Sequence, residues 1–194
     1  MASYFPLSNR PRRDEADVTS NWSRHRGTVL LDLAALLEGL TVEEWELPAL
    51  VAGNSVRDTV AELVWRSTTT RLSRLRSSRP TSEEPAALAA AVRAAATADL
   101  TAGAKRRVGE LGDAVVAAYE IAAATGHPVT VDRVASGAVA LARGLSGPVG
   151  VRAVTRERTL VASDAEWRVG RGPALEGTAA GIVLYLFGRA PLAR

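Results

Sequence analysis

The sequence of 194 residues contains no cysteine, and this absence excludes several kinds of chemistry. A disulfide framework, a thiolate metal site and a catalytic cysteine all require that residue. Histidine is scarce as well, since the chain holds only His25 and His127. We expect His25 to be a surface or boundary side chain and His127 to lie beside a helix C-terminus. Two such histidines do not support a Ser-His-Asp triad, and no Gly-x-Ser-x-Gly motif accompanies them.

Long apolar segments are also missing. The longest apolar run covers residues 179–187, which is far too short to span a bilayer. Residues 1–16 contain proline and arginine but no apolar stretch of signal-peptide length. We therefore expect a cytoplasmic protein with no membrane partner.

The charge is modest and is carried almost entirely by arginine. The formal net charge is +3, with 24 basic and 21 acidic residues, and Lys105 is the only lysine. Arginine in place of lysine, together with abundant alanine, is typical of a GC-rich bacterial genome. Such a small net charge argues against nucleic acid as a partner, because nucleic-acid binding usually needs a clustered basic face. Four basic groups still leave an anionic polymer as an alternative: Arg10/Arg12/Arg13, Arg71/Arg74/Arg76/Arg79, Lys105/Arg106/Arg107 and Arg152/Arg156/Arg158.

The apolar pattern predicts a mostly α-helical chain in three parts. Residues 1–16 are expected to form a flexible arm, residues 17–147 a helix bundle, and residues 148–194 a small α/β unit. The capping-box pattern that begins at Thr41 predicts a short helical turn, and Thr130 is the predicted N-cap of the last bundle helix. The expected helices cover residues 17–40, 55–77, 85–98, 102–125 and 130–145.

The last 47 residues have a different pattern of apolar residues, which predicts a β-β-α arrangement. Residues 151–162 and 166–169 have the short apolar pattern of a β-hairpin, and residues 174–187 resemble a closing helix.

Several stretches together resemble the mycothiol-dependent maleylpyruvate isomerase family of the DinB-like superfamily. Their order and spacing agree with that family over roughly residues 17–190. The stretches are Trp45-Glu46-Leu47-Pro48, residues 53–63 (GNSVRDTVAEL), residues 117–126 (AAYEIAAATG), Trp167-Arg168-Val169-Gly170, Gly177-Thr178-Ala179-Ala180 and Leu184-Tyr185-Leu186-Phe187-Gly188-Arg189.

This resemblance implies a DinB-like four-helix bundle with a divalent, usually zinc-like metal and a small C-terminal unit over the site. It also implies a metal that activates a low-molecular-weight thiol such as mycothiol, or a water molecule. The family's ligands are one histidine and a Glu-x-x-x-His pair. These three positions fall here on Glu62, Asp113 and Ala117, and a following family aspartate appears as Glu120. Neither histidine of the chain aligns with a ligand.

The three carboxylates left at these positions allow two interpretations. Glu62, Asp113 and Glu120 could converge on a hard divalent ion such as magnesium or manganese. Alternatively, they are solvated or pair with arginines such as Arg57 or Arg107.

Two hypotheses about function follow. The first is a diverged member that keeps the fold and a ligand cleft but has lost the thiol-dependent chemistry, and acts as a ligand-binding or regulatory protein. The second is a mycothiol-dependent metalloenzyme, an isomerase or transferase, using the carboxylate-rich site. In either case a small thiol or carboxylate is the expected ligand, Arg189 is the best candidate to contact it, and a homodimer is the oligomer typical of the superfamily.

Overall fold

The computed structural model of the chain describes residues 21–68, 84–102 and 104–192. The described part is mostly helical, as the sequence predicts, and carries a small three-stranded sheet near its C-terminus. The predicted arm at residues 1–16 and the end of the second predicted helix, residues 69–77, lie outside the described residues.

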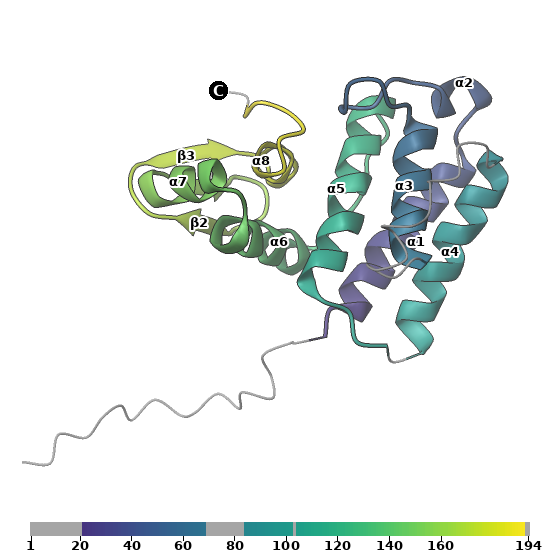
Figure 1. Cartoon of the computed structure of the whole chain (residues 1–194), viewed down its shortest axis with the longest axis horizontal. Coiled ribbons are helices and arrows are strands. Elements are labelled where there is room, and N and C mark those ends of the chain that lie inside the picture. Colours follow the sequence, from purple (N-terminus) through teal and green to yellow (C-terminus); the bar gives the residue numbers. More distant parts are fainter. Residues whose placement is uncertain (1–20, 69–83, 103, 193–194) are drawn as a thin grey trace, which may run out of the picture.

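Four long helices pack side by side (Figure 1). They are α1 (Ser23–Glu38), α3 (Val56–Thr68), α4 (Pro85–Thr101) and α5 (Val108–Thr125). The short helix α2 (Val42–Trp45) joins α1 to α3, and it starts with the predicted capping box at Thr41. Helix α1 buries Val29, Leu30, Leu33 and Leu37, whose three- and four-residue spacing forms one apolar face.

Helix α5 is the central element of the fold. It contacts α1 and α3 on one side and α6 (Arg133–Ser146) and α8 (Ala179–Leu186) on the other. A helix covered on two sides must be apolar around most of its circumference. Its sequence satisfies this, because nearly every residue from Leu111 to Ile121 is buried. Glu120, within this buried stretch, is therefore enclosed by packed neighbours.

The C-terminal unit contains more elements than the predicted β-β-α order. It comprises α7 (Val149–Glu157), β1 (Thr159–Ala162), β2 (Arg168–Gly170), β3 (Ala174–Gly177) and α8. The sheet order is β2-β1-β3, with β1 antiparallel to β2 and parallel to β3. Figure 1 shows this unit beside α5, away from α1 and α4.

Several boundaries in the sequence prediction are wrong. Residues 151–157 are helical, because Val151 and Val154 share one helix face packed against the core. Residues 174–177 form β3, and α8 begins only after Thr178, whose side chain caps it by accepting the Gly181 amide hydrogen.

The first turn of α6 is capped by Asp132 and not by Thr130, because the Asp132 carboxylate accepts the Val134 amide hydrogen at 2.9 Å. Helix α5 starts at Val108 and not at residue 102, since α4 continues to Thr101.

Within the described residues, no single helix is long and apolar enough to cross a membrane. Helices α6 and α7 reach the required length and composition only as a pair bent by 109°.

Candidate functional site

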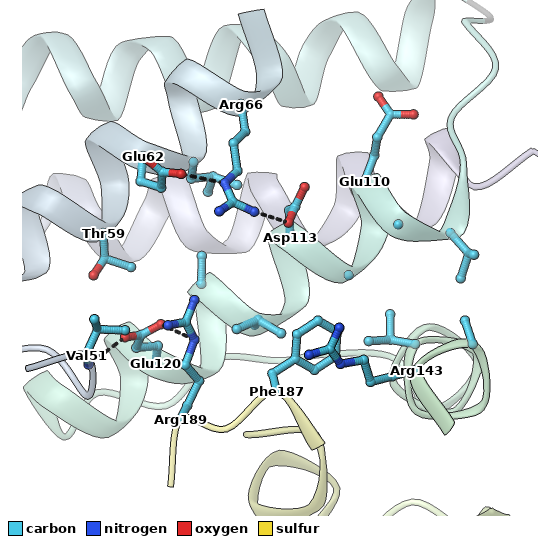
Figure 2. Close-up of a pocket in the computed structure, with 18 of the residues that line it drawn as sticks. Val51, Thr59, Glu62, Arg66, Glu110, Asp113, Glu120, Arg143, Phe187 and Arg189 are labelled. Atoms are coloured by element: carbon cyan, nitrogen blue, oxygen red, sulfur yellow. Dashed lines mark hydrogen bonds and ion pairs between the residues drawn. The ribbon is translucent and has the colours of Figure 1, made fainter. Parts of the chain in front are cut away.

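A cavity lies between α3, α5, α6 and the segment that follows α8 (Figure 2). Its volume is about 860 Å³, which is within the usual range for small-molecule sites. The predicted site residues Glu62, Asp113, Glu120 and Arg189 all line this cavity. The structure therefore brings the four candidate site residues of the sequence analysis to one cavity.

Helix periodicity explains how α3 and α5 present these groups. Glu62 and Arg66 are four residues apart on α3, so they lie on the same face. Asp113 and Glu120 are seven residues apart on α5, which again places them on one face, two turns from each other. Contact between α3 and α5 brings the two faces together.

Arg66 bridges two of the three carboxylates. Its Nε donates to Glu62 Oε1 at 2.6 Å, and its Nη1 donates to Asp113 Oδ1 at 3.0 Å, as Figure 2 shows. Burial alone would lower the pKa of Arg66, but the Glu62 hydrogen bond and the charge of Asp113 outweigh it, so the net pKa is raised. The guanidinium therefore remains charged and holds both carboxylates.

The third carboxylate belongs to a different set of contacts. Glu120 is 2% exposed, and its Oε1 accepts the Val51 amide hydrogen at 3.1 Å. Its Oε2 lies 3.6 Å from Nε of Arg189, which reaches over from the chain after α8 (Figure 2). That separation is too long for a hydrogen bond, and Nε of Arg189 is buried without any hydrogen-bond partner in the structure. The Nη groups of Arg189 donate no hydrogen bond to a described residue, and its side chain is partly exposed, so these groups are the donors that a ligand can use.

Another arginine that borders the cavity, Arg143, has no carboxylate partner among the described residues. Arg143 on α6 stacks on the ring of Phe187, with its guanidinium carbon 4.5 Å from the ring centroid. Its Nε donates to the Leu186 carbonyl oxygen at 3.1 Å. Both contacts fix the plane of the guanidinium, and neither uses its Nη groups.

The residues present do not fit the zinc-like ion that the family resemblance implies. No group of three or more histidine, aspartate or glutamate side chains within the described ranges is placed so that it could hold a metal ion. Arg66 lies between Glu62 and Asp113, so a cation bound there would have to displace a guanidinium. The geometry supports pairing with an arginine, although the partner is Arg66 and not Arg57 or Arg107.

The two histidines lie outside this cavity. Nδ1 of His25 lies 3.1 Å from Asp132 and its ring lies next to that of Trp22, in agreement with a boundary position. Nε2 of His127 lies 2.7 Å from Glu44 Oε1, just beyond the end of α5.

Arg66, Arg143 and Phe187 were not identified as site residues from the sequence. The Glu62–Arg66 spacing of four was a signal for Arg66, and Phe187 stood in a stretch that carries the family resemblance. Nothing local marked Arg143, because its place depends on the packing of α6 against α8.

Comparison of the chain with protein-family models, with curated proteins and with solved structures gave no match.

Proposed function

We propose that this protein binds a small carboxylate-bearing molecule in the cavity between α3, α5, α6 and the segment after α8, as a ligand-binding or regulatory protein. The observation that carries this proposal is that two carboxylates of the cavity are paired, whereas two of its arginines have hydrogen-bond donors without a partner in the described part of the chain. Glu62 and Asp113 are satisfied by Arg66, whereas the Nη groups of Arg143 and Arg189 donate to no described residue. A planar carboxylate matches the fork of hydrogen-bond donors that a guanidinium presents.

The cavity wall also suits a ligand with an apolar body. Phe187, Val116 and Val139 border it beside the two arginines. Small-molecule sites typically combine such apolar walls with a few fixed polar groups. Arg143 is fixed by its stacking on Phe187, so less side-chain entropy is lost when a ligand binds it.

We further propose that the fold is a diverged DinB-like bundle of the maleylpyruvate isomerase type. The four packed helices and the small C-terminal unit beside them support this proposal. So does the fact that Glu62, Asp113 and Glu120, which stand at the positions of the family's site residues, all line one cavity. The absence of a fitting metal-ligand set favours binding over the thiol-dependent chemistry of the family.

The alternative is a metalloenzyme that uses Glu62, Asp113 and Glu120 with a small thiol. One observation favours it, namely that all three carboxylates line the same cavity. It requires a near-stoichiometric divalent metal in protein purified without chelator or histidine tag, and loss of that metal and of turnover in Glu62→Ala. Equal metal content in the parent and in this variant would rule the alternative out.

Ligand-observed NMR with a panel of small aliphatic and aromatic carboxylates tests the binding proposal. We expect some members to bind the parent and to lose binding in Arg143→Met and Arg189→Met. The matched control is Arg93→Met, because Arg93 pairs with Glu38 far from the cavity. Binding that survives both cavity substitutions, or that is lost equally in the control, would contradict the proposal.

A further inference from the structure

The C-terminal unit carries five arginines that form no ion pair with any described residue; one is Arg168 in β2, and the other four lie in or beside α7. Arg152 and Arg156 lie in α7, Arg158 follows that helix, and Arg171 follows β2. Arg156, Arg158 and Arg171 are exposed, and Arg152 is half-buried. By contrast, Arg57, Arg66, Arg93, Arg106 and Arg133 each pair with a carboxylate.

The four arginines in or beside α7 gather at one end of the unit. Arg152 and Arg156 are four residues apart on α7 and share a face. The amide hydrogen of Arg171 is donated to the Thr155 carbonyl oxygen at 2.9 Å, so the turn after β2 lies against the end of α7. Glu157 is the only acidic residue between positions 146 and 163. The local charge is therefore clearly positive.

Two exposed aliphatic side chains adjoin this charge. Leu145 and Val149 are 70% and 73% exposed, more than any other large apolar side chain in the described residues. They flank the turn between α6 and α7. Val149 lies three residues before Arg152 and seven before Arg156, which places all three on one face of α7. We call Leu145, Val149, Arg152, Arg156, Arg158 and Arg171 the basic corner.

We propose that the basic corner docks the protein on an anionic phospholipid surface. Arginine side chains near a membrane surface are attracted to its anionic headgroups. Aliphatic side chains beside them gain by entering the boundary between headgroups and acyl chains. A nucleic-acid backbone would satisfy the arginines but leave Leu145 and Val149 in water. A second copy docked on the same surface would oppose like charges.

This inference is independent of the ligand in the cavity. The expectation of no membrane partner rested on the lack of a spanning segment, whereas docking at a surface needs none. Ala135, Ser136, Val139 and Ala140 hold α6 in the folded core, and docking through the basic corner leaves that packing unchanged.

Co-sedimentation of the full chain with vesicles tests this proposal. The vesicles contain phosphatidylcholine alone or with phosphatidylserine, and the key variant is Arg156→Glu/Arg158→Glu. Its matched control is Arg24→Glu/Lys105→Glu, which changes two exposed basic residues of the bundle by the same charge. We expect the parent and the control to bind only the anionic vesicles, and the key variant to bind them at least about tenfold more weakly. Circular dichroism verifies that both variants are folded.

The apolar half of the basic corner is tested by Leu145→Ser/Val149→Ser. We expect this variant to bind anionic vesicles several-fold more weakly than the parent, most clearly at high salt, where the arginines are screened. Equal binding to neutral vesicles, equal losses in the key variant and its control, or salt-dependent binding to DNA without vesicle binding would each overturn the proposal.

Discussion

Asp99 shows how a single buried charge organises the bundle. Its side chain is fully buried on α4, and it accepts hydrogen bonds from Arg26 of α1 and from Nε of Arg106 at 2.7 Å. Arg26 is 2% exposed and also donates to Ser67 Oγ at 2.5 Å. The group therefore ties α1, α3 and α4 to the start of α5.

We expect Asp99→Ala to lower the free energy of unfolding by about 3–5 kcal/mol, because it leaves the buried Arg26 without its charge partner. The matched control is Glu38→Ala, which removes an exposed pair with Arg93 between the same two helices. An exposed pair is worth about 0–1 kcal/mol. Urea denaturation measures both changes, and similar losses in the two variants would show that the buried pair is not special.

Tyr119 provides a prediction about pH. Burial raises its pKa from 10.0 to about 12; a hydrogen bond with Ser136 opposes this, and the charge of Asp164 adds to it. The folded protein therefore holds this proton more tightly than the unfolded chain does. We expect its contribution to stability to be complete below pH 10 and to be lost as the pH rises to about 12.

Denaturation curves at several alkaline pH values, for the parent and Tyr119→Phe, measure this effect. The variant lacks the titrating hydroxyl, so its free energy of unfolding should decline less between pH 10 and about 12 than that of the parent. An identical decline in both proteins would mean that Tyr119 is not the group responsible.

At the scale of elements, the bundle helices could be predicted because each buries a face with helical spacing. The stripe on α1 and the all-round apolar sequence of α5 are examples. Helix α7 and strand β3 could not be predicted in the same way. Val149, Val151 and Val154 are β-branched residues that favour a strand, and only packing against α6 and the sheet decides for a helix. Strand β3 forms by pairing in parallel with the edge of β1 that β2 does not occupy.

The N-cap of α6 was predicted at Thr130 but lies at Asp132 in the structure, and two substitutions distinguish these positions. We expect Asp132→Ala to destabilise the protein by about 0.5–2 kcal/mol, because it removes the carboxylate that caps α6. Thr130→Ala is the matched control, since Thr130 is exposed and lies outside the helix. Thermal or urea denaturation compares the two variants, and a larger loss for Thr130→Ala would restore the cap predicted from the sequence.

For the whole molecule, the mostly helical fold could be predicted better than the chemistry of the cavity. The family resemblance placed Glu62, Asp113, Glu120 and Arg189 on one site, and these residues do line one cavity. Which charges remain available there depends on Arg66 and Arg143, whose contacts arise from packing between helices distant in the sequence. Localisation and oligomeric state stay predictions.

The central claim is that Arg143 and Arg189 recognise a carboxylate. Isothermal titration of the best-binding acid and of its primary amide, with the parent and with Arg143→Met, tests this most directly. A hydrogen bond to a charged group is worth about 1.5–3 kcal/mol, so we expect the variant to lose roughly ten- to a hundredfold in affinity for the acid. Affinity for the amide should change little. Equal losses for acid and amide, or unchanged affinity for the acid, would contradict the claim.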